Sequence, residues 1–447
     1  MAYAKQLYFI LVLAGYLVAG ALFAIYTPAW QAPDEPAHYN YIRQVATGGC
    51  CPRVDSGDWQ SDYLSQLTSA RFAPAQLDRL DTLQYEDHQP PLYYLLASVV
   101  YKYSDGDLIA LRLLSVALGA LVVCLSYATV LIIVPNQPQI ALAAAALIAF
   151  APQHLSMSAA VNNDALAEAL VALALLWLIR YLQGEGLAVW QLALIVGAAL
   201  WTKTTVYFLA PLALLGIVLK WRRGSEAVQA LLRALAAFLL IAGFIGGLWW
   251  LRNISVYGFP DFLGLAAHDQ VVADQPRTSD YIAQHGLNTY LGRMLSTTFK
   301  SFWGQFGWMA LPLDNVLGGW IYRGFGLLVI AGLSGLLLAG RSASAERHGA
   351  AHRPVNRSVL IVLLATILLV ALQFIYYNIE FQQWQGRYLF PALIPIAFQL
   401  SFGVDHWRAR LLSRWEAARW LTPLAFSGLF ALDIYLLFRV IVPGLSP

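Results

Sequence analysis

Long apolar stretches alternate with short polar ones over most of the 447-residue sequence. A helix that crosses a bilayer needs roughly 20 mainly apolar residues. About eleven runs approach or exceed that length, at 7–27, 107–134, 139–159, 163–182, 187–204, 205–220, 229–251, 320–340, 358–377, 388–404 and 420–442. An outer-membrane barrel would instead show short segments in which apolar and polar residues alternate. The pattern predicts an all-α polytopic membrane protein, with residues 1–447 in a single membrane domain.

Two longer segments, 28–106 and 252–319, are too polar to lie inside a bilayer and are rich in aromatic residues. Within the first segment, the apolar stretch 91–103 is too short to cross the membrane and carries several tyrosines. Tyrosine is enriched at the level of the lipid headgroups, so this stretch predicts an interfacial helix. We expect short interfacial helices from both segments to cover a cavity at the membrane surface.

The distribution of Lys and Arg predicts the orientation of the chain, because cytoplasmic loops carry an excess of both residues. The short outer loops hold little beyond Lys203 and Arg387 if the N-terminus lies inside. The inner loops then hold Lys5, Arg180, Lys220, Arg222, Arg223, Arg233, Arg341, Arg347, Arg353, Arg357, Arg408, Arg410, Arg414 and Arg419. Both long polar segments are therefore expected on the extracytoplasmic side. The first run is longer than the core of a usual signal peptide, so we interpret it as a retained helix.

Composition supports this class, since 59% of the residues are hydrophobic and only 12% are charged. The net charge of +3 comes without a basic block, so no nucleic-acid partner is indicated. No phosphate-binding loop of the ATPase type is present. Cys50 and Cys51 are adjacent in the first outer segment, where a vicinal disulfide can form if that segment is extracytoplasmic. The sequence leaves their oxidation state open.

The stretch "PDEPAHYNY" places two adjacent carboxylates, Asp34 and Glu35, just where the chain leaves its first apolar run. They suit the start of a helix, because Asp is a favoured N-cap and Pro36 fits the first turn. They also suit a catalytic base held at the membrane surface, where its pKa can be tuned. His38 lies four residues after Asp34 and therefore shares a helix face with it.

A second polar group, Glu86, Asp87 and His88, precedes two prolines in "YEDHQPPLYYLL". It suits a solvated turn. It equally suits a site in which these side chains join Asp34 or Glu35 around a substrate or a divalent metal. Carboxylates with few other ligands would favour magnesium or manganese. The sequence contains no recognised metal motif, so the metal ligands stay unknown.

A third polar stretch, "EFQQWQGRYLFP", lies at an outer membrane boundary and contains Gln385, Arg387 and Tyr388. The guanidinium fork of Arg387 matches the oxygen atoms of a phosphate group. The preceding Gly386 would let the backbone approach a ligand closely. An arginine that merely extends to the headgroups among aromatic neighbours is the alternative. The surrounding glutamines favour phosphate binding.

Weaker candidates lie at other outer helix ends. Lys203 in "WTKTT" and Arg252 in "WWLRN" either extend to the lipid headgroups or assist at a phosphate. Asn163 and Asp164 in "VNNDAL" either cap the following helix or contact a sugar.

Taken together, "PDEPAHYNY", "HQPPLYY", "NND" and "QGRYLFP" resemble motifs of the C-type integral-membrane glycosyltransferases. The resemblance is to a bacterial subgroup related to the protein O-mannosyltransferases and aminoarabinose transferases. It implies a polyprenyl-phosphate-linked sugar as donor and transfer on the extracytoplasmic face of the bacterial inner membrane. It also implies a single displacement in which Asp34 is the catalytic base, with Glu35 as its neighbour. Arg387, assisted by Lys203 or Arg252, would stabilise the leaving phosphate.

The resemblance does not identify the acceptor, which is a glycan, a lipid or a protein in different relatives. Two other functions remain as alternatives: a transporter or flippase of lipid-linked sugars, and a non-catalytic partner in envelope assembly. A transporter of this kind would show repeated halves with broken helices at corresponding positions. The sequence shows no such repeat, which favours the transferase.

Overall fold

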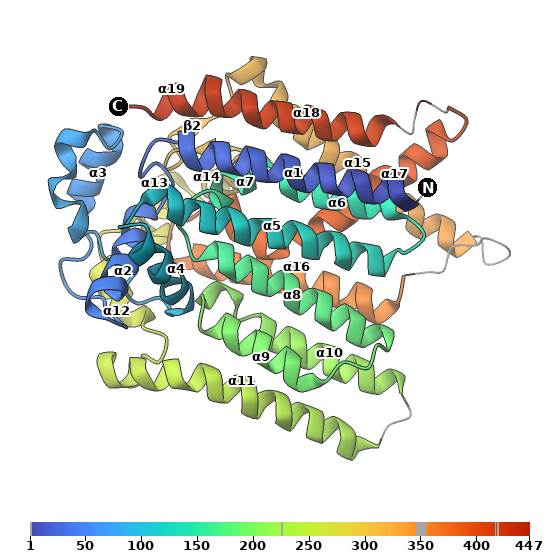
Figure 1. Ribbon diagram of the computed structural model, residues 1–447, viewed down its shortest axis with the longest axis horizontal. Helices are drawn as coiled ribbons and strands as arrows, with labels where there is room; N and C mark the ends of the chain where they lie inside the picture. Colours follow the sequence, from blue (N-terminus) through green and yellow to red (C-terminus); the bar gives the residue numbers. More distant parts are fainter. Residues whose placement is uncertain (1, 225–226, 346–354, 416, 418–419) are drawn as a thin grey trace.

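The computed structural model describes residues 2–224, 227–345, 355–415, 417 and 420–447. Almost all of its elements are helices, and most of them run side by side in one bundle (Figure 1). The predicted all-α polytopic fold is confirmed. Three of the cations expected in inner loops, Arg347, Arg353 and Arg419, lie outside the described residues.

Within the described part of the chain, nine helical segments are long and apolar enough to cross a membrane. Their main helices are α1 (Ala2–Tyr26), α5 (Leu108–Ile133), α8 (Asp164–Gln183), α10 (Leu209–Arg223), α11 (Val228–Tyr257), α15 (Trp320–Ala345), α16 (Arg357–Glu380), α17 (Leu393–Leu412) and α18 (Leu421–Leu436). Short helices extend four of them, namely η2 (Thr204–Val206), η3 (Val316–Gly319), η4 (Gly386–Ala392), and η6 (Leu437–Ile441) with α19 (Val442–Leu445). The protein is therefore a multi-pass membrane protein.

The described residues contain fewer spans than the eleven or so predicted. The run 139–159 folds as α6 (Pro138–Ala149) and α7 (Pro152–Ser158), which are bent by 63°. Pro152 has no backbone N–H and cannot continue the hydrogen bonds of α6. The run 187–204 forms only α9 (Val189–Leu200), whose 12 residues extend about 18 Å. That is shorter than a hydrocarbon core of roughly 30 Å. If the bent pair is one span, the described residues contain ten.

Short elements of the two polar segments gather at one end of the bundle, on the left in Figure 1. The first segment contains α2 (Glu35–Gly48), α3 (Ser61–Ser69), η1 (Pro74–Thr82) and α4 (Leu92–Tyr103). The second contains α12 (Leu265–Val271), α13 (Thr278–His285), α14 (Leu287–Trp303) and the antiparallel strands β1 (Gln305–Phe306) and β2 (Leu311–Pro312). Helix α4 matches the interfacial helix predicted for 91–103. We refer to this end as the outer end.

The two polar segments bind each other. Trp59 and Ser61 of the first segment both donate hydrogen bonds to the carboxylate of Asp274 in the second. The backbone N–H of Val54 donates to the hydroxyl of Tyr257, at 3.1 Å. The segments therefore form one layer over the outer helix ends.

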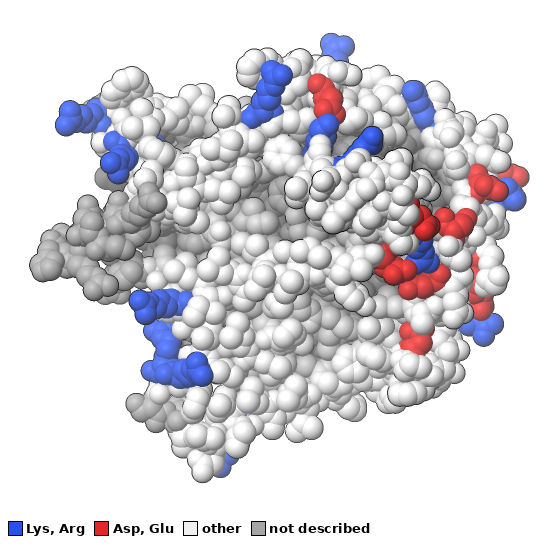
Figure 2. All heavy atoms as spheres, turned by 180° about the vertical axis from the view of Figure 1, so that it is seen from behind, with Lys and Arg blue, Asp and Glu red and all other residues white. Residues whose placement is uncertain are grey.

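On the face drawn in Figure 2, acidic residues gather towards one end of the molecule. In Figure 2 the left-hand end shows Lys and Arg but no Asp or Glu, while acidic residues gather towards the outer end on the right. The predicted inner loops connect the helices at this left-hand end. This separation is what the excess of cytoplasmic Lys and Arg predicts.

Candidate active site

Asp34 begins helix α2 in an unusual backbone conformation. Its φ of 67° lies in the left-handed region, which Asp tolerates better than most residues. Asp34 occupies the N-cap position of α2 and Pro36 lies in its first turn, as predicted, but the Asp34 side chain makes no capping hydrogen bond. The carboxylate instead accepts hydrogen bonds from the Tyr85 hydroxyl, at 3.0 Å, and from Nη2 of Arg387, at 2.5 Å.

Arg387 belongs to η4, which packs tightly against α14. The backbone N–H of Gly386 donates to Oγ of Ser301, at 2.7 Å. A Cβ at position 386 would collide with the backbone of Thr298 and Phe302. Gly386 is therefore needed for the approach of η4 to α14, and the predicted approach of its backbone to a ligand is not the reason for the glycine. The contact fixes the start of the Arg387 side chain.

A second ion pair lies beside the first. Nζ of Lys203, in the loop after α9, is 2.6 Å from Oδ1 of Asp164, the first residue of α8. Lys203 is buried and Asp164 is partly exposed. The buried Asn163 side chain does not cap α8 and instead donates to the carbonyl of Thr202, at 3.4 Å. Asn163 therefore occupies the N-cap position of α8 without a capping hydrogen bond from its side chain.

His38 lies within the electrostatic reach of both ion pairs. Its Nδ1 is 2.8 Å from the hydroxyl of Tyr94. Burial and then the charge of Lys203 lower the pKa of His38 to about 3, against the opposing charges of Asp34 and Asp164. The imidazole is therefore neutral near pH 7. Asp34, Arg387, Asp164, Lys203 and His38 form one group, which we call the outer charge cluster.

Adjacent Glu35 points to different partners. Nε and Nη2 of Arg112 donate to its two carboxylate oxygens, at 2.8 and 2.6 Å. The backbone N–H groups of Trp30 and Val161 donate to the same carboxylate. Glu35 and Arg112 are both fully or almost fully buried. This ion pair joins the start of α2 to α5 and to the segment before α8.

The residues of the second predicted group separate from one another. Burial and then the charge of Asp34 raise the pKa of Glu86, which places its carboxyl near the outer charge cluster. Buried Asp87 points elsewhere and accepts a hydrogen bond from Gln44, at 2.7 Å. The ring of buried His88 packs against the ring of His268, with centroids 4.2 Å apart.

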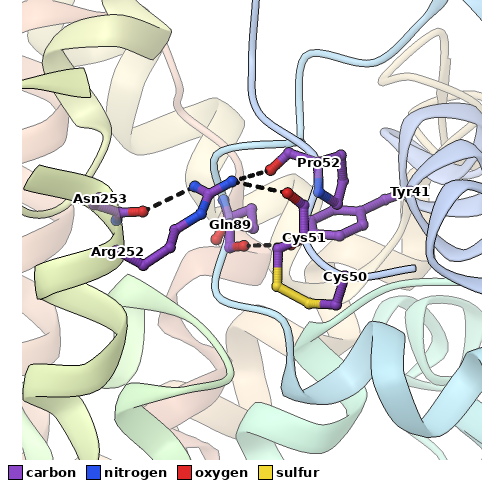
Figure 3. The surroundings of a disulfide bond; sticks show 7 residues. All are labelled: Tyr41, Cys50, Cys51, Pro52, Gln89, Arg252 and Asn253. Carbon is purple, nitrogen blue, oxygen red and sulfur yellow. Dashed lines mark hydrogen bonds between the residues drawn. A yellow bond between two sulfur atoms is a disulfide. The ribbon is translucent and has the colours of Figure 1, made fainter. Parts of the chain in front are cut away.

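Arg252 does not join the outer charge cluster. Its guanidinium donates to the carbonyl groups of Cys51 and Pro52 (Figure 3). The guanidinium also lies over the ring of Trp249. Cys50 and Cys51 are joined by a disulfide. Arg252 therefore holds the disulfide loop against α11, a contact that the sequence did not suggest.

The remaining residues of the third stretch stay close to Arg387. The ring of Tyr388 lies under its guanidinium, 5.3 Å from the centroid. Gln385 donates to the side chain of Gln383, at 3.1 Å.

The sequence did not single out Tyr85 or Arg112. An arginine inside the apolar run 107–134 was a signal for Arg112, since charges in spans are rare and paired. Nothing in the sequence separated Tyr85 from the many other tyrosines.

The charges within the cluster determine the state of Asp34. Burial favours its neutral acid, but the guanidinium of Arg387 and the hydrogen bonds from Arg387 and Tyr85 outweigh burial. The pKa of Asp34 is therefore below its ordinary value, and the side chain is a carboxylate near pH 7.

In the described part of the chain, no three His, Cys, Asp or Glu residues are grouped so that they could hold a metal ion. The carboxylates of the cluster are bound to cations of the protein itself.

The bundle has known structural relatives. The chain is 16% identical to ArnT from Cupriavidus metallidurans bound to undecaprenyl phosphate, with a TM-score of 0.54 over 98% of this chain and 73% of that one. For the same protein in the apo state, the identity is 14% and the TM-score 0.52, over 100% and 74% of the two chains. No curated protein matches the sequence. At these identities the likeness shows the fold.

The fold defines the class: a polytopic membrane protein with the GT-C fold of membrane glycosyltransferases. The predicted resemblance is confirmed at this level. The chain belongs to the family described as "Predicted membrane protein (DUF2142)", whose model matches residues 56–396. The matched region includes Lys203 and Arg387 and begins after Asp34.

Proposed function

We propose that this protein is a membrane glycosyltransferase that moves a sugar from a polyprenyl-phosphate donor to an acceptor hydroxyl. The contact between Asp34 and Arg387 carries the proposal, since 353 positions separate these residues in the sequence. It combines a carboxylate that can accept a proton with a guanidinium that can bind a phosphate, at one end of a GT-C bundle. ArnT, which shares the fold, binds undecaprenyl phosphate.

The reaction is a single displacement. The acceptor oxygen forms a bond to the anomeric carbon of the sugar while its proton passes to Asp34. The bond between the anomeric carbon and the phosphate oxygen breaks, and the lipid phosphate leaves with the electron pair. Arg387 and Lys203 stabilise this departing charge, which we expect to be a main contribution to the rate. These steps depend on the side chains of the cluster, and the predicted magnesium or manganese remains a prediction.

Glu35 is not the base in this proposal, because Arg112 binds both of its carboxylate oxygens. The raised pKa of Glu86 follows from burial and the charge of Asp34. The Glu86 carboxyl can hydrogen-bond to a sugar hydroxyl at this position. We assign Glu86, His38 and Asn163 to the sugar because they lie beside the ion pairs of the outer charge cluster. The acceptor is a glycan, a lipid or a protein.

We place the reaction on the extracytoplasmic side of a bacterial inner membrane. The argument is the excess of Lys and Arg at the opposite end of the bundle. The donor's lipid tail would lie along the membrane-spanning helices, which holds the phosphate at their outer ends. The cluster lies at that level, where a lipid-anchored head group and a water-borne or lipid-borne acceptor can meet.

The test uses purified protein in nanodiscs and a panel of radiolabelled polyprenyl-phosphate sugars. We expect the wild type to release label from one donor, and Asp34→Asn to release it at least about 10²-fold more slowly. Asp81→Asn is the matched control, because Asp81 is an exposed carboxylate of the same outer layer. It should release label at the wild-type rate.

Two results would contradict the proposal. If Asp34→Asn released label as fast as Asp81→Asn, Asp34 would not be the base. If the wild type bound a donor, moved it across a bilayer and never released label, the protein would be a transporter of lipid-linked sugars.

A further inference from the structure

Two arginines of the outer end bind carboxylates in different ways. Arg112 presents the side of its fork to Glu35, with Nε and Nη2 each bound to one carboxylate oxygen. Its Nη1 donates to the carbonyl groups of Ala24 and Thr27. Arg387 donates to Asp34 through Nη2 alone. Its Nε is buried and has no hydrogen-bond partner among the described residues.

On the side of the guanidinium formed by Nε and Nη2, both nitrogens are therefore hydrogen-bonded in Arg112. In Arg387 only Nη2 is bonded. A buried N–H group without a partner is unfavourable, because it has lost its bonds to water. Two oxygen atoms of a phosphate group match the spacing of Nε and Nη2 and bind both at once. A phosphate that uses this side of the guanidinium places one oxygen atom on Nε and another on Nη2, where it meets the carboxylate of Asp34. The two anions then compete for Nη2.

We infer that the donor phosphate displaces Asp34 from Arg387, so that donor binding itself releases the catalytic base. This inference rests on the proposed function and adds an order of events to it. After the exchange, the Tyr85 hydroxyl still holds Oδ1 of Asp34. Oδ2, which now faces Arg387, becomes free to accept the proton of the acceptor hydroxyl. Tyr85 keeps the carboxylate in place while its partner changes.

Lys203 needs no such exchange. Its ammonium group carries three donors, and Asp164 is bound at one oxygen, 2.6 Å away. Lys203 can therefore add a phosphate oxygen and keep Asp164. We therefore place the competition between carboxylate and phosphate at Arg387, where a buried Nε has no partner. Asp34 is the residue whose removal should reveal it.

The test measures the affinity of the protein in nanodiscs for radiolabelled undecaprenyl phosphate, the lipid bound in the ArnT structure. We expect Asp34→Asn to bind this lipid more tightly than the wild type, by roughly tenfold. The neutral amide competes less for Arg387. Asp81→Asn should bind it as the wild type does. Undecaprenol, which lacks the phosphate, should bind equally to all three proteins.

A second measurement uses the wild type alone, so that it does not depend on how a variant folds. The fall of kcat/KM at low pH reports the pKa of the base in the free enzyme. The fall of kcat at low pH reports the pKa of the base in the enzyme with donor bound. Release from Arg387 makes Asp34 more basic, so the fall of kcat should lie at higher pH. The titratable and charged groups that face Asp34 are Arg387, Tyr388, His38, Tyr85, Glu86 and Tyr377.

The outcomes separate the two proposals. Equal or weaker binding of undecaprenyl phosphate by Asp34→Asn, or a fall of kcat at the same pH as that of kcat/KM, would overturn the exchange and leave the transferase intact. No binding of the lipid phosphate by the wild type would overturn the donor class, and the exchange with it.

Discussion

Glu35 is predicted to stabilise the folded protein rather than to take part in the transfer reaction. Its side chain is 0% exposed and that of its partner Arg112 is 2% exposed. Glu35→Gln leaves the guanidinium buried without a counter-charge, which typically costs about 3–5 kcal/mol. We expect a large drop in the thermal unfolding midpoint in detergent. Glu380→Gln removes an acid that is 61% exposed and should leave the midpoint unchanged. A normal midpoint with lost activity would instead assign Glu35 to the reaction.

Asp87 predicts a pH dependence of stability. Burial raises the pKa of Asp87 to about 8, against 3.8 as the ordinary value. Between these values the folded protein binds a proton that the unfolded chain does not, so stability falls as pH rises. The loss should be on the order of a few kcal/mol between about pH 5 and pH 8.

The check on Asp87 is the unfolding midpoint of the wild type and of Asp87→Asn across that range. The amide keeps the hydrogen bond partner of Gln44 but cannot ionise. The variant should therefore lose less stability than the wild type as pH rises. The same slope in both proteins would show that another group is responsible.

At this scale the sequence singled out side chains that the structure brings together, but it did not predict their pairing. Asp34, Lys203 and Arg387 stand out because charges at membrane boundaries are rare in this chain. Which carboxylate meets which cation depends on contacts between residues far apart in the chain. Asp34 and Glu35 are neighbours in sequence, and helix α2 directs them to different partners. No local pattern distinguishes these directions.

Among the elements, η4 and α14 together position Arg387, and Gly386 is their point of closest approach. Gly386→Ala should push η4 away from Thr298 and Phe302 of α14. A misplacement of about 1 Å at a catalytic group can cost as much as 10²-fold in rate. We expect donor turnover to fall by roughly that factor.

The matched control for this variant is Gly292→Ala. Gly292 lies in α14, the helix against which η4 packs, and a Cβ there would meet no atom within 4 Å. Its activity should be unchanged, because Ala is also the better helix former. If Gly386→Ala were as active as Gly292→Ala, the tight contact would not be what positions Arg387.

The elements also show where a hydrophobic pattern ceases to be informative. Long runs such as 229–251 and 358–377 became long helices, as their length predicts. The runs 139–159 and 187–204 are equally apolar, yet one bends at Pro152 and the other gives a helix of 12 residues. An apolar run indicates only that its segment is shielded from water in the folded protein. A segment can be shielded inside a bundle without crossing the bilayer.

For the molecule as a whole, the chain path and the charges support one orientation, in which the outer charge cluster faces away from the cytoplasm. Cysteine labelling tests it with two isosteric changes at exposed positions, Ser65→Cys in α3 and Ser413→Cys at the opposite end. In right-side-out membrane vesicles, a membrane-impermeant maleimide should label Ser65→Cys at once. Ser413→Cys should react only after the membrane is permeabilised.

The wild type gives the background for this experiment, since Cys50 and Cys51 are paired and Cys124 is half-buried in α5. The reverse pattern of labelling would place Asp34 and Arg387 on the cytoplasmic side. The donor would then have to present its sugar there, and the excess of Lys and Arg would lie outside, against the usual rule. Labelling therefore tests the side of the reaction independently of any assay of sugar transfer.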